Sequence, residues 1–140
     1  MDFKKLKKYA IPALVVFIVL TIFDFVFHGI VMEKLYTQYA NLFRPQNVIC
    51  NHKYFFWLAN LIYSFAFYYI YSKGHEKGDP LKQGVRFALW IILLTVLPCT
   101  IVSYTIYPHP KNLELAWLLA YSAETILAGI TAAMVFPKIK

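Results

Sequence analysis

The sequence predicts an all-α fold: a four-helix transmembrane bundle in a single integral membrane domain, residues 1–140, with a short interfacial helix after the first span. The composition indicates lipid as the solvent, because the chain is 60% hydrophobic and only 15% charged, whereas soluble domains carry about 25% charged residues. A helix of about 20 apolar residues spans the hydrocarbon core of a bilayer. Four apolar stretches of suitable length follow one another, at residues 9–32, 54–71, 87–107 and 115–136.

The first stretch, residues 9–32, follows a basic N-terminus and therefore also resembles a secretory signal peptide. No cleavage site with small residues follows it, and the apolar run continues until it is long enough to span, so we expect a retained first helix. At residues 32–43 apolar side chains recur at helical spacing until Pro45 ends the pattern. This pattern predicts a helix at the membrane interface, or an extension of the first span that folds over the bundle.

The later spans are joined by short connections. We expect residues 44–53 to be irregular and polar, residues 72–86 to form a solvated turn broken by three glycines and a proline, and residues 107–112 to form a tight turn. Aromatic side chains lie near the span ends, where they typically anchor helices at headgroup level. A stacking site for a ligand is the alternative for this set, which comprises Tyr54, Trp57, Tyr68, Tyr69, Tyr71, Trp90, Tyr104, Tyr107 and Trp117.

The basic residues indicate topology, although a net charge of +7 in a soluble protein would suggest nucleic acid. Only four of them belong to one side of the predicted bundle: Lys34, Arg44, Lys53 and Lys111. The other side receives Lys4, Lys5, Lys7, Lys8, Lys73, Lys77, Lys82, Arg86, Lys138 and Lys140. The positive-inside rule therefore places both termini in the cytoplasm, and we expect no nucleic-acid partner.

Each predicted span carries a polar residue at a similar depth. At 1.5 Å per residue from the outer end of each span, Asp24, Asn60 and Thr100 lie about 10 Å below the outer boundary of the hydrocarbon, and Glu124 about 14 Å. His28 lies one turn above Asp24 on the same helical face. An ionisable residue in mid-membrane costs about 2.5 kcal/mol or more, so such residues face a bundle interior or a watery cavity. We therefore expect these five residues to form an intramembrane polar layer.

Three uses of this layer stay open from the sequence. Neutral carboxyl groups could hydrogen-bond to the neighbouring helices and fix their packing. Alternatively, the layer could be a ligand or proton site that opens outward. The third use is a metal site, with Cys50, His52 and His109 of the outer loops as candidate ligands beside His28. No CxxC or HExxH pattern supports a metal, so its presence is unknown.

Catalysis has no recognisable constellation in the chain. There is no glycine-rich phosphate loop and no nucleophile elbow, so no catalytic residue and no cofactor are predicted. We expect Ser64 and Ser103 to form hydrogen bonds to backbone or to another helix. Glu33 and Glu114 are interpreted as ordinary interfacial charges.

Five segments occur in an unusual order: "DFVFHGIVM", "LYTQYANLFRP", "GVRFALW", "YTIYPHP" and "AETILAGI". In this order they resemble a family of small bacterial integral membrane proteins of unassigned function, from about Asp24 to Phe136. The resemblance implies four helices in a bacterial inner membrane and supplies no reaction, cofactor or substrate. The segment "VICNHK", which holds Cys50 and His52, departs from the shared pattern.

The expected function is a non-catalytic accessory or scaffold subunit in the lipid bilayer, which forms a homo-oligomer or part of a larger membrane complex. The alternative is an outward-facing protein that binds or transports a small ligand, a metal or a proton through the polar layer. For an enzyme, the discriminating observation would be a cavity that opens to the outer leaflet and reaches Asp24 and Glu124 together. A dry, fully packed layer would exclude both the enzyme and the transport hypotheses.

Overall fold

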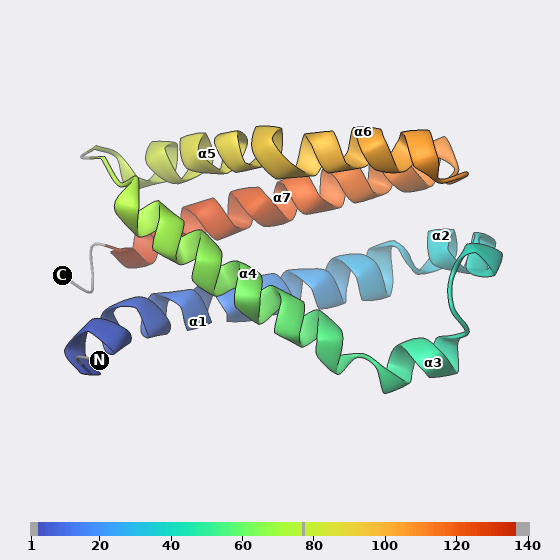
Figure 1. Cartoon of the computed structure of the whole chain (residues 1–140), viewed down its shortest axis with the longest axis horizontal. Coiled ribbons are helices and arrows are strands. Elements are labelled where there is room, and N and C mark those ends of the chain that lie inside the picture. The colour runs from blue at the N-terminus through green and yellow to red at the C-terminus, as the bar shows by residue number, and fades with distance from the viewer. Residues whose placement is uncertain (1–2, 77, 137–140) are drawn as a thin grey trace.

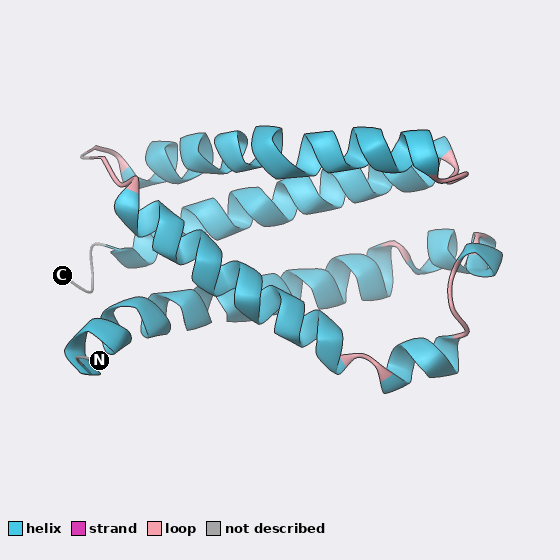
Figure 2. Ribbon diagram, in the orientation of Figure 1, coloured by secondary structure: helices cyan, strands magenta, loops and turns pink. Residues whose placement is uncertain are grey.

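The computed structural model describes residues 3–76 and 78–136, with residues 3–7 described by their backbone alone. Every regular element in this part of the chain is helical (Figure 2), which confirms the all-α prediction. The elements are α1 (Phe3–Val26), η1 (Phe27–Val31), α2 (Glu33–Gln38), η2 (Ala40–Leu42), α3 (Gln46–Asn51), α4 (Tyr54–Lys73), α5 (Pro80–Ile91), η3 (Ile92–Val96), α6 (Leu97–Ile106) and α7 (Lys111–Val135). Outside the described residues lie Lys77, Lys138 and Lys140 and the side chains of Lys4, Lys5 and Lys7.

Three helical stretches are long and apolar enough to cross a membrane: Lys8–Val31, Pro80–Ile106 and Lys111–Val135. They correspond to the first, third and fourth predicted spans. The second predicted span is α4, which at 20 residues is about 30 Å long. This helix is not among the three stretches, because its tyrosine, serine and asparagine side chains lower its mean hydropathy. A membrane-spanning α4, and with it the four-helix transmembrane bundle, stays a prediction.

Figure 1 shows how the long helices lie. The rod formed by α5, η3 and α6 runs alongside α7, while α4 crosses α1, and α1 also packs against α7. The beginning of α1, the end of α7 and the α4–α5 connection lie at one end of the molecule, which we call the N-terminal end. The short helices α2 and α3 and the α6–α7 turn lie at the opposite end, the α3 end.

The buried core lies toward the N-terminal end and is made by three helices. Small alanines of α7 let α1 and α4 approach closely, as is common between membrane helices. Large apolar side chains such as Ile18, Ile22 and Leu94 are exposed instead, as expected of faces that contact lipid. The core comprises Ala13, Val16, Leu20, Phe67, Tyr68, Tyr71, Ala128, Ala132 and Ala133.

Two of the predicted loops are partly helical. The predicted solvated turn is shorter than residues 72–86, because α5 begins at Pro80, whose fixed φ suits the first helical position. Asp79 caps α5 by accepting a hydrogen bond from the Leu81 N–H at 2.9 Å. The connection expected to be irregular at residues 44–53 contains α3. The predicted interfacial helix is divided into α2 and η2.

A π-helical turn, η3, interrupts the third apolar stretch directly before Pro98. Proline lacks an N–H, and its ring clashes with the carbonyl four residues earlier, here that of Leu94. The backbone widens locally, so that the Leu97 N–H bonds to the Ile92 carbonyl five residues earlier. The rod then continues as α6, which carries Cys99, Thr100 and Ser103 along α7.

Two glycines hold α5 and α7 in direct backbone contact. A Cβ atom added at Gly84 would overlap the Gly129 carbonyl, and one added at Gly129 would overlap the Gly84 carbonyl. Small residues permit such close crossings of membrane helices. The sequence placed Gly84 in a turn, whereas the structure buries it in this crossing.

Replacing Gly129 with alanine should therefore destabilise the fold by about 1–3 kcal/mol, the usual cost of overpacking. Gly29→Ala is the matched control, because a Cβ atom there meets nothing within 4 Å. The free energy of unfolding, measured by denaturant titration in bicelles, should fall for Gly129→Ala alone. Equal stability of the two variants would contradict this crossing.

Candidate functional site

An open cleft of about 600 Å³ lies in the half of the molecule nearer the α3 end. It forms because α4 diverges from the α5–α6 rod toward that end (Figure 1). Its walls come from α4, from η3 with α6, and from α7. They comprise Ala59, Asn60 and Tyr63 of α4, Thr95 and Val96 of η3, Cys99, Thr100 and Ser103 of α6, and Glu114, Trp117, Tyr121, Glu124 and Thr125 of α7.

Asp24 and Asn60 meet, as expected from their similar depths. The Asn60 Nδ2 donates a hydrogen bond to the Asp24 Oδ2 at 2.6 Å, which joins α1 to α4. Asn60 lines the cleft, whereas Asp24 of α1 is not among the lining residues. The Asp24 carboxyl group is therefore linked to the cleft through the Asn60 amide.

His28 belongs to a different cluster from Asp24. Its Nδ1 lies 2.6 Å from the Tyr36 hydroxyl, which also accepts a hydrogen bond from the Trp117 Nε1 at 3.1 Å. Burial raises the pKa of the Tyr36 phenol above its ordinary value, so the hydroxyl keeps its proton. These three side chains join the end of the first span, α2 and α7.

Thr100 and Glu124 differ in how their polar atoms are satisfied. The Thr100 hydroxyl donates to the Val96 carbonyl of its own helical stretch at 2.9 Å, so it contributes no link between helices. The Glu124 carboxyl group has no hydrogen bond and no ion pair with any of the residues that the structure describes. The predicted polar layer is therefore not one closed network.

A second carboxyl group, which the sequence left as an interfacial charge, is buried beside the cleft. Glu114 is 5% exposed, and its Oε1 accepts hydrogen bonds from the Ser103 hydroxyl at 2.8 Å and from the His109 Nδ1 at 2.6 Å. Ser103 thus bonds to another helix, which is one of the two roles expected for it. The interpretation of Glu114 was wrong because the α6–α7 turn brings both partners onto it.

The cleft also contains a tyrosine bond that the polar pattern of the sequence did not reveal. The Tyr63 hydroxyl of α4 lies 3.2 Å from the Thr125 hydroxyl of α7. The Thr125 hydroxyl also donates to the Tyr121 carbonyl at 2.7 Å. This bond links α4 to α7 at the wall of the cleft. Tyrosines are so frequent in α4 that nothing in the sequence singles out Tyr63.

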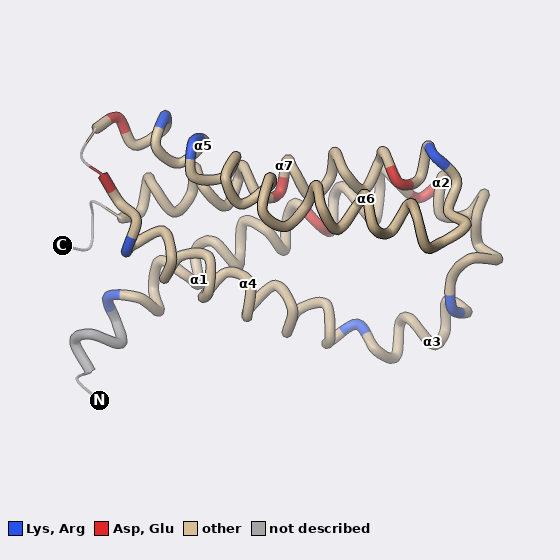
Figure 3. Tube along the Cα trace, turned by 45° about the horizontal axis from the view of Figure 1, so that its top comes forward, with Lys and Arg blue, Asp and Glu red and all other residues tan. Residues whose placement is uncertain are grey.

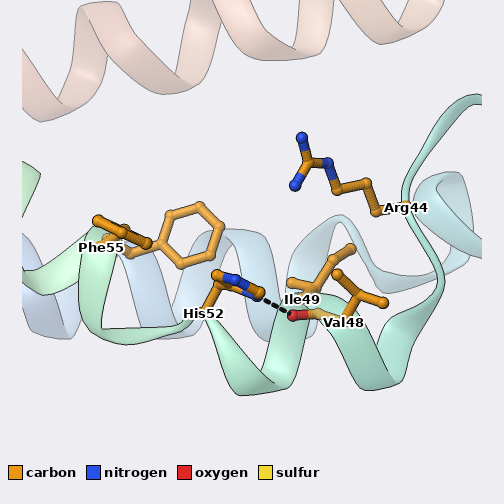
Figure 4. A pocket seen from close by; sticks show the side chains of 6 residues that line it. Arg44, Val48, Ile49, His52 and Phe55 are labelled. Carbon is orange, nitrogen blue, oxygen red and sulfur yellow. Dashed lines mark hydrogen bonds between the residues drawn. The ribbon is translucent and has the colours of Figure 1, made fainter.

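The candidate metal ligands have separate partners. The His52 Nδ1 lies 2.8 Å from the Val48 carbonyl, and its ring stacks on Phe55 under Arg44 in a shallow hollow of about 190 Å³ (Figure 4). Cys50 is exposed, and His109 pairs with Glu114. Within residues 3–76 and 78–136, no group of three or more His, Cys, Asp or Glu side chains could hold a metal ion. The structure therefore does not assemble Cys50, His52 and His109 into a site.

Comparison with family models, with curated proteins and with solved structures gave no match.

The Asp24–Asn60 bond should contribute measurably to the packing of α1 on α4. Asn60→Ala removes the donor, and the expected loss of unfolding free energy is about 0.6–1.7 kcal/mol, the range found for hydrogen bonds between membrane helices. Asn47→Ala, at an exposed position of α3, serves as the control in the same bicelle titration. If both substitutions leave stability equally unchanged, the bond has no energetic role.

The Tyr36 hydroxyl should hold α2 against the bundle. Tyr36→Phe removes a bond worth about 1 kcal/mol, which predicts amide exchange in α2 that is about fivefold faster. Tyr54→Phe is the control, since no hydrogen bond joins its hydroxyl to the described residues. Exchange in α2 that is unchanged by Tyr36→Phe would show that other contacts hold this helix.

Proposed function

We propose that this chain is an integral membrane protein that binds a small ligand in the cleft between α4, α6 and α7. The observation that carries the proposal is the Glu124 carboxyl group, which lines a cleft of about 600 Å³ and has no bond to the described residues. Ionisable residues within spans mark ligand or ion pathways more often than inert packing. A ligand in the cleft would supply the partner that the protein itself does not.

The dimensions and lining of the cleft support this proposal. Ligand sites typically enclose about 300–1,000 Å³, and combine apolar or aromatic walls with a few polar groups. Tyr63, Trp117 and Tyr121 supply the aromatic walls, and Asn60 and Glu124 supply polar groups. The polar groups thus face a shared space and are not sealed in packed helix contacts.

We further propose that the cleft faces outward from a bacterial inner membrane, with both termini cytoplasmic and α4 as the fourth span. Support comes from the basic residues, ten of which the sequence assigns to the side of the termini. Among the described residues, Lys8 lies early in α1, Lys73 ends α4, and Lys82 and Arg86 lie in the first turns of α5. These segments belong to the N-terminal end, where Figure 3 shows blue Lys and Arg positions. The resemblance to small bacterial membrane proteins stays an expectation.

The accessory or scaffold role, alone or within a larger membrane complex, also stays a prediction. That role requires helix faces that bind a partner and has no need of an unbonded carboxyl group in a cleft. It was predicted from the small size of the chain, its short loops and the lack of a catalytic constellation. The open cleft therefore gives the ligand-binding alternative the more direct support.

Cys99 provides a test, because it lines the cleft and Cys50 does not. In proteoliposomes, the variant Cys50→Ser should react at Cys99 with a small, water-soluble thiol reagent added outside. Among positive, neutral and negative small molecules, at least one class should slow this reaction about fivefold or more at saturation. The same compounds should leave the rate at Cys50, measured in the variant Cys99→Ser, unchanged.

The proposal fails if Cys99 is unreactive in the bilayer but reactive after unfolding in detergent, because lipid would then fill the cleft. It also fails if no compound protects Cys99 selectively. Ala59→Trp, which places a large side chain in the cleft wall, should slow labelling of Cys99 in the same assay without slowing labelling of Cys50.

A further inference from the structure

We infer that the ligand of the cleft carries a substituted ammonium group, which pairs with the Glu124 carboxylate and lies against the aromatic walls. This inference rests on the proposed function and names its ligand class. It is carried by the charge, the aromatic lining and the volume of the cleft.

The charge balance of the cleft favours a cation. No lysine or arginine is among the described residues that line it. The Glu114 carboxyl group faces His109 and Ser103, and the Asp24 carboxyl group accepts from Asn60. Glu124 is thus the acidic group of the lining that lacks a protein partner. A concave, weakly polar site with one sign of charge attracts ligands of the opposite sign.

The aromatic residues favour an organic cation. Ammonium groups bind over the faces of tryptophan and tyrosine rings within about 6 Å, with a stronger effect when water is excluded. The Trp117 N–H is engaged by Tyr36, and the Tyr63 hydroxyl by Thr125. What these two side chains chiefly offer a ligand is therefore their rings and not their polar tips.

A bare metal ion fits the lining less well. The described residues contain no group of three or more acidic, histidine or cysteine side chains able to hold one. The Thr95 and Thr100 hydroxyls are bonded to carbonyls of their own helical stretch. In addition, about 600 Å³ is far larger than the roughly 30 Å³ that one water molecule occupies in the liquid. An ammonium group with organic substituents can fill this volume, whereas a bare metal ion cannot.

The charge preference can be measured at Cys99 with two methanethiosulfonate reagents of similar size. One carries an ethyltrimethylammonium group and the other an ethylsulfonate group. In the variant Cys50→Ser in phosphatidylglycerol nanodiscs, the ratio of cationic to anionic reaction rates should fall about tenfold when Glu124→Gln is added. Glu33→Gln makes the same charge change at an exposed position of α2 and should shift the ratio less than twofold. A neutral methanethiosulfonate should react equally with all three proteins, which shows that Cys99 is equally accessible in each.

Reversible binding is measured with choline and its neutral isostere 3,3-dimethylbutan-1-ol as competitors. Choline should slow labelling of Cys99 by the neutral reagent to the same extent as the isostere at a concentration that is at least about tenfold lower. In the variant Glu124→Gln, the two competitors should act at equal concentrations. Ammonium groups also occur in lipid headgroups. Nanodiscs of phosphatidylcholine therefore form a second arm: weaker protection by free choline in these discs indicates a lipid-held ammonium, and equal protection indicates a soluble one.

The two proposals fail differently. Equal protection by choline and the isostere, or a rate ratio that Glu124→Gln leaves unchanged, overturns the cation inference while leaving a ligand-binding cleft. Cys99 that no reagent reaches from outside overturns the cleft as a site, and the cation inference falls with it. A rate ratio that Glu33→Gln lowers as much as Glu124→Gln also overturns the cation inference, because the preference would then arise from the general surface charge.

Discussion

A polar side chain within the hydrocarbon of a bilayer has no water to bind, and this constraint bears on every helix that is long and apolar enough to span. An ionisable side chain there is stabilised by a protein partner or a wet cavity, whereas the Ser64 and Tyr71 hydroxyls are buried without a hydrogen bond to the described residues. Asn60 binds Asp24, Thr100 binds its own helix, and Glu114 is bonded to His109 and Ser103. Glu124 alone among the cleft carboxyl groups uses none of these protein partners, so its position is tenable where water or a ligand reaches it.

The constraint on packing works differently at the two ends of the molecule. Toward the N-terminal end, Gly84 and Gly129 let the backbones of α5 and α7 touch, and the small alanines of α7 pack against α1 and α4. Toward the α3 end, the facing residues are large aromatic side chains such as Tyr63, Trp117 and Tyr121. Aromatic rings of α4 and α7 thus separate these helices toward the α3 end, and a wedge-shaped cleft lies between them. The cleft therefore follows from the distribution of residue sizes along α7 as well as from the divergence of α4.

Hydropathy and a count of residues along each helix were sufficient to predict three helical stretches that are long and apolar enough to cross a membrane. They also predicted similar depths for Asp24 and Asn60, which are hydrogen-bonded to each other. Features that depend on rotation about the helix axes were not predicted. His28 shares a face with Asp24 but bonds to Tyr36 of α2, and Thr100 shares the depth of Asn60 but bonds within its own helix. Glu114 was misread for a related reason, since the turn that brings His109 onto it is set by tertiary structure.

This difference between depth and rotation also explains why the sequence could not choose between a structural layer and a site. Four polar residues at similar depths, with His28 one turn above them, satisfy both descriptions equally well. The two descriptions differ in whether the polar side chains of the layer are hydrogen-bonded to one another. The structure places Asp24 and Asn60 in a bond at 2.6 Å and leaves the Glu124 carboxyl group on the cleft wall. The first arrangement joins α1 to α4, whereas the second adds no bond between the described helices.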